Sequence, residues 1–534
     1  MEKLNRILLY VFNAVFFWVV CSGFGYRAKA CNCDFIIDES VLYVDGNNLK
    51  IKPGATICIK ASEKKYLGFA NIHGTAEKPV TIVNCGGRVI VGNEDWYYGI
   101  RFNNCSNFRI TGTGDPQITY GFAVVKTANE IPGVSIGMLS TDVEIDHVEI
   151  GNTGFAGIMV KTDPDCSGIP NRGNFVQTNT YIHDNYIHNT KGEGIYLGFP
   201  HYRGVVKECN GSYIRVLPHD VVGVRIYNNL LKNIGREGIQ VGCATRDVKI
   251  FSNQIDTYGT VKEYYHSAGV HLSTGTTGEL YNNMISNGGG PGLWLNGAGD
   301  NFIYNNIFMN VALNGQIAIF LEDSLVSPGK GYHIINNTIL SEASQGIVMN
   351  SNFYSSGHEF INNILVTARG ENYFYVANPE AWVELANATA HSAEELFLNG
   401  YYLTEKSPMV DVGVETPGLA VTEDFEGNQR PRGNGIDIGA IESPFVREVD
   451  DFSVFPVPFA GEAKIVFFLK EETEVSLGLY DARGVLVKEI IPSKKMHSKH
   501  YNYTVNDTDL SSGVYFCRLQ RGKMVKAKKV VVQK

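Results

Sequence analysis

Apolar residues recur along the middle of the chain at fixed distances from an asparagine. A large apolar residue, usually Ile, stands three residues before the asparagine and another stands two residues after it, in seven copies between residues 182 and 365. The central amides are Asn185, Asn229, Asn253, Asn283, Asn306, Asn337 and Asn363. An earlier copy, residues 145–150, has Val148 in place of the amide. In most copies a glycine stands nine residues after the position of the asparagine, and an apolar residue follows the glycine directly, as in Gly194-Ile195.

The spacing of these copies predicts the stacked coils of a parallel β-helix. The shortest repeat, from Asn283 to Asn306, is 23 residues long, and each repeat holds short β-branched segments without helical periodicity. Such segments form strands that pair with the equivalent strand one turn along, about 4.8 Å away, and bury aliphatic side chains inside the coil. We expect each repeated Asn to adopt the left-handed conformation at a bend and to bond to the amides above and below it. We expect each repeated Gly to permit a sharp turn before the next strand.

Two other repeat folds agree less well with this pattern. A leucine-rich repeat also stacks asparagines, but its consensus is regular and dominated by leucine, whereas these repeats are rich in Ile and Gly and vary in length. A propeller blade needs about 40–45 residues for its four antiparallel strands, which the shortest repeats do not provide. The sequence therefore predicts an all-β solenoid over most of the chain.

The N-terminus has the pattern of a secretion signal. Lys3 and Arg6 precede an apolar run over residues 7–20, and Ala28 and Ala30 supply the small residues of a cleavage site. The alternative, a membrane anchor, would need about 20 apolar residues. We therefore interpret residues 1–30 as a cleaved signal peptide and expect no transmembrane span in the mature protein.

Charge and cysteine content narrow the class of protein further. The chain of 534 residues carries a formal net charge of −9, so it lacks the excess of basic residues that nucleic-acid-binding proteins have, and we expect no nucleic-acid partner. We also expect a monomer. Ten cysteines in an exported chain favour disulfides. Cys166 and Cys209 lie in long insertions of neighbouring repeats and are candidates for one bridge, while spacing leaves the other pairings open.

Two segments that flank the repeats resemble known β-helix proteins. LKIKPGATICIKAS with HGTAEKPVTIVNCGG, within residues 49–87, resembles the opening coil of secreted right-handed β-helix proteins, including the pectate-lyase-like and alginate-lyase-like groups. LTEKSPMVDVG and DFEGNQRPRGNGIDIGAIE, within residues 403–442, resemble the segment that closes many such helices. The resemblance implies a right-handed parallel β-helix domain over residues 31–445. It leaves the activity open, because this coil hosts lyases, hydrolases, epimerases and adhesins.

The C-terminal residues 446–534 have a different sequence pattern, in which strands alternate with short turns. FPVPF, YDARGVLVKEI and LSSGVYFCRLQRGKMVKAKKVVVQK resemble the C-terminal sorting domain of the type IX secretion system, a small β-sandwich, although Val457 stands where the family usually has Asn. The resemblance implies a partner in the type IX secretion machinery, export across an outer membrane, and an extracellular or cell-surface location. The alternative is an ordinary adhesion or carbohydrate-binding sandwich.

Alternation along the strand after each repeated glycine predicts one shared outer face. Residues two positions after the glycine point away from the coil, and on successive repeats they include Met159, Tyr196, Gln240, His271 and Trp294. Lys161 lies on the same face, and Glu193 and Glu237 stand just before two of the glycines. Long insertions near this face carry Arg203, Tyr265 and further cations and tyrosines, and we expect them to wall a groove. Such a groove in an acidic protein predicts an anionic polysaccharide as ligand.

These residue types suit β-elimination from a uronate polysaccharide. The reaction needs a cation at the sugar carboxylate, a base at the C5 proton and an acid at the leaving oxygen. The candidates are Lys161 or His271 as base, Tyr196 or Tyr265 as acid, and Arg203 or Arg236 as the cation. Gln240 and Trp294 are candidate substrate-binding residues.

The two glutamates have a separate candidate role. Glu193 and Glu237 are candidate ligands for calcium, which prefers carboxylates.

Other functions remain open at this stage. A lysine such as Lys161 is more often a solvated surface residue, and His271 and Trp294 are compatible with the cover of a strand. The two glutamates are compatible with bonding to turn amides or with pairing to Lys191 and Arg236. A non-catalytic surface protein that binds glycans is one alternative. A pectin-type glycoside hydrolase is another, but the paired Asp residues and the Gly-His segment of that family are missing.

Overall fold

The structure is a computed structural model of the whole chain. It describes residues 31–533 except residues 96, 264, 324–325, 328, 351–356, 371, 379, 381, 397, 417, 447–451, 456, 458, 460, 470 and 498–499. The predicted signal peptide therefore lies outside the described residues.

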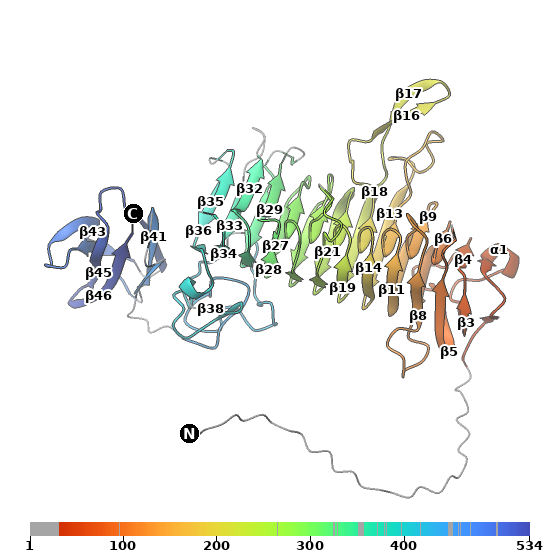
Figure 1. Cartoon of the computed structure of the whole chain (residues 1–534), viewed down its shortest axis with the longest axis horizontal. Coiled ribbons are helices and arrows are strands. Elements are labelled where there is room, and N and C mark those ends of the chain that lie inside the picture. Colours follow the sequence, from red (N-terminus) through yellow and green to blue (C-terminus); the bar gives the residue numbers. More distant parts are fainter. Residues whose placement is uncertain are drawn as a thin grey trace, which may run out of the picture.

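A parallel β-helix forms the larger part of the molecule, as predicted (Figure 1). One face of the coil is a 12-stranded parallel sheet, hereafter the short-strand sheet. Its strands are β2 (Tyr43–Asp45), β4 (Leu67–Ala70), β6 (Ile100–Asn103), β9 (Val134–Gly137), β12 (Ile158–Val160), β15 (Ile195–Leu197), β20 (Ile239–Val241), β23 (Val270–Leu272), β26 (Leu293–Leu295), β29 (Ile317–Glu322), β32 (Gln345–Asn350) and β35 (Asn372–Val376).

The other two faces belong to a 23-stranded sheet that bends at a corner of the coil. The column before the corner contains β1 (Phe35–Ile37), β3 (Thr56–Lys64), β5 (Val80–Gly92), β7 (Ser106–Thr111), β10 (Thr141–Asp146), β13 (Val176–His183), β18 (Asp220–Tyr227), β21 (Ala244–Phe251), β24 (Gly278–Tyr281), β27 (Asn301–Tyr304), β30 (Tyr332–Ile335), β33 (His358–Ile361) and β36 (Trp382–Leu385). The column after it contains β8 (Phe122–Lys126), β11 (Val148–Thr153), β14 (Tyr186–Thr190), β19 (Leu230–Ile234), β22 (Gln254–Asp256), β25 (Met284–Ser286), β28 (Ile307–Val311), β31 (Thr338–Ser341), β34 (Ile364–Thr367) and β37 (Ala388–Ala390). Aliphatic side chains from all three faces fill the coil, as Ile182, Ile187 and Ile195 do in one rung.

The repeated asparagines form a buried ladder at the corner between the two columns. The Nδ2 group of each donates to the Oδ1 atom of the next, for example from Asn229 to Asn253 at 3.0 Å. The ladder gains Asn387, which accepts from Asn363 at 3.1 Å and which the apolar pattern missed because Glu384 and Thr389 flank it. The expectation of a left-handed ladder residue was wrong. The left-handed residue is the one before it, such as Asn228 with φ 54°, because the ladder amide must point inward between rungs.

The repeated glycines lie at bends directly before the next strand, as expected, for example Gly194 before β15 and Gly238 before β20. These two glycines do not have the positive φ that only a glycine adopts readily. A Cβ atom at Gly194 would lie 2.5 Å from the carbonyl oxygen of Gly238 on the next rung, and one at Gly238 would lie 2.5 Å from that of Gly269. The glycines are therefore required by the close approach of stacked backbones.

Shorter elements accompany the solenoid. They are α1 (Gly46–Leu49), the antiparallel hairpin β16 (Val205–Cys209) with β17 (Ser212–Val216), the 3₁₀ turn η2 (Glu394–Leu396), and β38 (Leu398–Asn399) with β39 (Tyr402–Leu403). The segment after β39 packs against the corner of the last rungs, where the Nδ2 groups of Asn305 and Asn336 donate to its carbonyls. Buried Arg430 holds this segment together through Glu442, at 2.6 Å.

The C-terminal domain is a sandwich of two antiparallel sheets, as predicted. One sheet contains β40 (Phe452–Phe455), β41 (Glu462–Phe468) and β44 (His500–Asn506), and the other contains β42 (Thr473–Tyr480), β43 (Leu486–Met496), β45 (Gly513–Arg521) and β46 (Met524–Val532). Phe467, Leu477 and Cys517 lie in the core between them. Among the described residues, no helix is long and apolar enough to cross a membrane.

Replacing one ladder residue tests its contribution to stability. Asn253 is fully buried, and its Oδ1 atom accepts from the backbone and side chain of Asn229. Asn253→Ala leaves these donors unpaired, so we expect the free energy of unfolding in urea to fall by about 3 kcal/mol. The matched control is Gln254→Ala at the exposed neighbouring position, where we expect little change. Equal losses in the two variants would contradict a stabilising ladder.

Candidate active site

The stacked strands bring the predicted residues together on the outer face of the short-strand sheet. Tyr196 pairs in register with Gln240, Gln240 with His271, and His271 with Trp294. The alignment continues from Trp294 to Phe320 on β29. The predicted register is therefore confirmed, and residues separated by whole rungs become neighbours.

A cavity of about 430 Å³, hereafter cavity A, opens over this face. It is lined by Phe155, Lys161, Glu193, Tyr196, Pro200, His201, Arg236, Gln240, Tyr265, His266, His271, Ser273, Thr274, Trp294 and Asn296. All but two of the predicted site residues are in this set. Glu237 lies beneath the cavity and contacts two of the lining histidines. Arg203 does not line it.

The position of Arg203 differs from the expected one because its insertion folds on itself. Residues 205–216 pair as the antiparallel hairpin β16–β17, which stands away from the solenoid instead of lying across it (Figure 1). Arg203 is exposed at the base of this hairpin, where its carbonyl accepts from Arg215 at 3.2 Å. Its side chain therefore does not contribute to cavity A.

The two insertions beside cavity A are tied to one another. A disulfide joins Cys166 to Cys209, which confirms that candidate bridge. The guanidinium of Arg172 lies 3.7 Å from the centre of the Tyr202 ring and donates to the Tyr202 carbonyl at 2.8 Å. Buried His219 donates through Nδ1 to the carbonyl of Pro170 at 3.2 Å. These contacts join the two loops into one wall beside cavity A.

Two further disulfides join Cys31 to Cys85 and Cys33 to Cys58 in the first coils. They fasten the start of the solenoid, and spacing had left these pairings open.

Two buried glutamates lie at the edge of cavity A with opposite protonation preferences. Burial, together with the charge of Glu237, raises the pKa of Glu193 to about 7. Burial acts in the same direction on Glu237, but the hydrogen bond from His266 and the charge of His271 outweigh it and lower the pKa of Glu237 to about 2. The Nδ1 atoms of His266 and His271 lie 3.2 and 3.6 Å from Glu237 Oε1.

The cations of cavity A are held by carboxylates and rings. Arg236 Nη1 lies 3.6 Å from Glu193 Oε1, and its Nε atom donates to Glu263 at 2.8 Å. Lys161 Nζ lies 3.0 Å from Asp163 and 4.7 Å from the centre of the Tyr196 ring. Burial raises the pKa of Tyr196, so its phenol stays protonated at neutral pH.

The donor set at the two glutamates is a poor match for calcium. One oxygen each of Glu193 and Glu237 and a nitrogen of His266 lie within 4.8 Å of one another, and both Oε2 atoms are buried without a hydrogen-bond partner among the described residues. Calcium takes six to eight oxygen ligands, and imidazole suits transition metals better. Arg236, His266 and His271 already face the two carboxylates.

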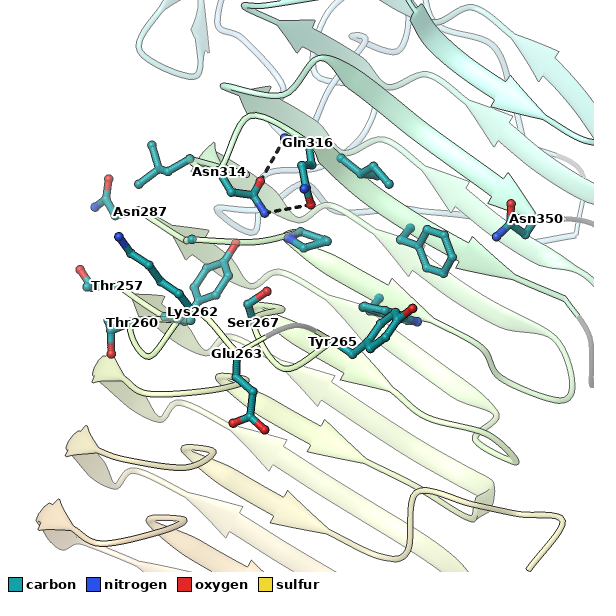
Figure 2. A pocket seen from close by; sticks show the side chains of 18 residues that line it. Thr257, Thr260, Lys262, Glu263, Tyr265, Ser267, Asn287, Asn314, Gln316 and Asn350 are labelled. Carbon is teal, nitrogen blue, oxygen red and sulfur yellow. Dashed lines mark hydrogen bonds between the residues drawn. The ribbon is translucent and has the colours of Figure 1, made fainter.

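A second and larger cavity, hereafter cavity B, adjoins cavity A on the next rungs. Its volume is about 920 Å³, and it shares Tyr265 and Trp294 with cavity A. Figure 2 shows the labelled polar side chains that line cavity B, most of which are hydroxyls and amides. The sequence pattern missed this cavity because Ala318 replaces the repeated glycine on the rung of Phe320.

The disulfide between the wall loops gives a first prediction for the site. In the double variant Cys166→Ser and Cys209→Ser, we expect faster amide hydrogen exchange in residues 163–175 and 205–216, because the loops lose their covalent link. The urea midpoint of the solenoid should change little, since neither loop belongs to its core. As a control, Cys33→Ser with Cys58→Ser should leave exchange in the wall unchanged. Unaltered exchange in the variant without the Cys166–Cys209 disulfide would show that the other contacts between the two loops are sufficient to hold them together.

The carboxylate beneath the cavity gives a second prediction. The hydrogen bond to Glu237 raises the pKa of His266, because the carboxylate stabilises the imidazolium. In Glu237→Gln we therefore expect the pKa of His266 to fall toward the ordinary value of about 6.5, measured by NMR titration. Glu279→Gln, a change at a glutamate paired with Lys249, is the control and should have no effect. An unchanged pKa in Glu237→Gln would remove Glu237 as the partner of His266.

Two segments of the chain match known family models. Residues 205–378 match the model of the right handed beta helix region, and residues 453–533 match the model of the secretion system C-terminal sorting domain. A search of curated proteins found no match.

Solved structures that resemble the chain have low identity to it. Alginate lyase from Paenibacillus sp. str. FPU-7 is 14% identical, with 66% of this chain and 95% of that chain covered and a TM-score of 0.33. Pectate lyase Pel9A is 13% identical, with 77% and 97% covered and a TM-score of 0.37. The AlgE4 A-module, a mannuronan C-5 epimerase of Azotobacter vinelandii, is 12% identical, with 66% and 91% covered and a TM-score of 0.29. Such TM-scores carry no argument about function. By its coil and its family matches, the chain is a right-handed parallel β-helix protein with a secretion-system C-terminal sorting domain.

Proposed function

We propose that this protein cleaves an acidic polysaccharide by β-elimination in cavity A. The observation that carries the proposal is His271, which lies in the cavity with Glu237 behind it and with the cations Arg236 and Lys161 on the same lining. A base backed by a buried carboxylate and surrounded by cations is what proton abstraction beside a sugar carboxylate requires.

His271 is the better of the two predicted bases. Its Nδ1 atom faces the carboxylate of Glu237 at 3.6 Å, and its Nε2 atom lies 3.3 Å from the side-chain amide of Asn296 at the cavity. A carboxylate on the Nδ1 side favours the tautomer with its proton there, and the Asn296 amide then turns its Nδ2 group to the Nε2 lone pair until substrate displaces it. Lys161, by contrast, is an ammonium paired with Asp163 and suits the binding of a carboxylate.

The elimination then needs only side chains that already line cavity A. Arg236 and Lys161 bind the uronate carboxylate and stabilise the charge that develops as His271 Nε2 removes the C5 proton. The electron pair of that C–H bond forms the C4–C5 double bond, and the C4–O bond breaks. Tyr196 donates its phenolic proton to the leaving oxygen and then regains a proton from solvent, while His271 releases the C5 proton to solvent.

The two carboxylates favour hydrolysis as a second candidate. Retaining glycosidases hold two carboxyl groups about 5–5.5 Å apart and raise the pKa of the acid. Glu193 and Glu237 have oxygens within 4.8 Å and pKa values shifted in opposite directions. Glu237 is completely buried and does not line the cavity, however, so it cannot reach a sugar, and elimination is the first candidate.

The sorting domain supports a site of action outside the cell. We propose that the type IX secretion machinery recognises residues 446–534 and exports the chain across an outer membrane. Cavity A would then meet polymers of the cell surface or the surroundings.

The reaction can be tested with residues 31–534 and a panel of uronate polymers. We expect a new ultraviolet absorbance from the double bond with at least one of alginate, polygalacturonate and gellan. With that polymer, His271→Ala should lower kcat by about 10²–10⁴-fold and change KM little, because a general base acts in the chemical step. The matched control is His333→Ala, a histidine paired with Glu359 on the other sheet, which should leave the rate unchanged.

Other outcomes would separate the competing functions. Reducing ends without the absorbance would show hydrolysis, and binding without either product would show a glycan-binding protein. Full activity of His271→Ala would remove it as the base. We expect a chelator to leave the rate unchanged, and a loss that calcium restores would place calcium at Glu193 and Glu237.

A further inference from the structure

The two cavities form one continuous surface with an abrupt change in chemistry. Trp294 lines both, and its ring contacts His271 on the side of cavity A and Phe320 on the side of cavity B, with centroid distances of 5.4 and 4.8 Å. Tyr265 also lines both and meets Trp294 edge to face at 5.7 Å. A polymer that follows the short-strand sheet along the solenoid would therefore pass from one cavity into the other.

Cavity B lacks the cationic character of cavity A. Among the described residues that line it, the one cation is Lys262 and the one carboxylate is Glu263, and Arg236 of cavity A already binds Glu263 at 2.8 Å. The other polar side chains that line it are hydroxyls and amides, namely those of Thr257, Tyr258, Thr260, Tyr265, Ser267, Asn287, Asn314, Gln316 and Asn350, with the indole of Trp294. Hydroxyls and amides both donate and accept hydrogen bonds, which matches the hydroxyls of an uncharged sugar.

The apolar part of cavity B complements the flat faces of sugar rings. Trp294 and Phe320 are half-buried and meet at 65°, so the two rings do not cover one another face to face. Apolar and aromatic surface with a few polar groups around it is the usual composition of a small-molecule site. At about 920 Å³ the cavity is more than twice the size of cavity A, which has about 430 Å³.

We propose that cavity B binds uncharged sugar units next to the acidic unit in cavity A, so that the substrate is a mixed polysaccharide and not a homopolymer of uronates. The identity of the acidic unit rests on the proposed function above. The binding of neutral units in cavity B does not, because it follows from the lining of cavity B alone. A homopolyuronate would place carboxylates against amides and aromatic rings, where no unpaired cation other than Lys262 lies among the described lining residues.

Affinity electrophoresis can test this inference without relying on cleavage. The His271→Ala chain, residues 31–534, is run in gels that contain gellan, in which neutral sugars flank each glucuronate, or polygalacturonate, in which every unit is charged. We expect stronger retardation by gellan. Adding Phe320→Ala should weaken gellan binding by about tenfold, the equivalent of about 1.4 kcal/mol, and leave polygalacturonate binding unchanged.

Two further variants guard against indirect effects. Asn314→Ala changes an exposed amide at the rim and should also weaken gellan binding without disturbing the core. Phe302→Ala is the matched control, because this half-buried ring stacks on His333 on the other sheet, and it should change neither polymer's binding.

The possible results separate this inference from the proposed function. Gellan binding that depends on Phe320 and Asn314, together with no unsaturated product from any of the polymers when the chain keeps His271, would overturn the lyase and support cavity B. Equal or stronger binding of polygalacturonate, or gellan binding that is indifferent to Phe320 and Asn314, would overturn the inference even if His271 proved to be the base.

Discussion

The hydrogen bonds between equivalent residues of successive rungs fix the register on which the rest of the structure depends. At the corner, buried amides such as Asn253, Asn283 and Asn306 bond to one another at 3.0 Å, so each rung has one alignment with the next. A slip of one residue would turn the outward side chains of the short-strand sheet into the core. Because the corner prevents this slip, Lys161 and Trp294, which lie more than a hundred residues apart, line a single cavity.

The electrostatics of cavity A contrast with those of the ladder that supports it. Ladder amides are buried and paired, so they stabilise the coil and leave nothing to react. Glu193 and Glu237 are equally buried, but each keeps an oxygen without a partner among the described residues. Two adjacent buried carboxylates are unfavourable unless cations or protons neutralise them. Here the histidines lower the pKa of Glu237, while burial and the charge of Glu237 raise the pKa of Glu193 to about 7, an unequal division typical of functional sites.

The parts of the fold that repeat could be predicted from the sequence, and the parts that occur once could not. Seven aligned asparagines predicted the coil and placed Tyr196, Gln240 and His271 side by side, because stacking copies one geometry from rung to rung. The path of an insertion follows no such rule, so the hairpin that carries Arg203 away from the face was missed. Cavity B was missed because it lies where Ala318 breaks the glycine pattern. The left-handed residue was placed one position late, since the ladder amide is chosen for its inward hydrogen bonds.

The arrangement of aromatic rings explains why a sugar would bind to the short-strand sheet and not to the opposite surface. On the 23-stranded sheet, Tyr227, Phe251, Tyr281 and Tyr304 stack nearly parallel, with centroids 4.9–5.0 Å apart and interplanar angles of 2–4°. The inner rings of that stack have both faces covered by their neighbours, so they stabilise the register and offer only edges. Trp294 meets both Tyr265 and Phe320 at 65° instead, so neither ring stacks on its face, and Trp294 lines both cavities. Aromatic side chains thus have two roles in one solenoid, and the angle between neighbouring rings decides which surface can bind a ligand.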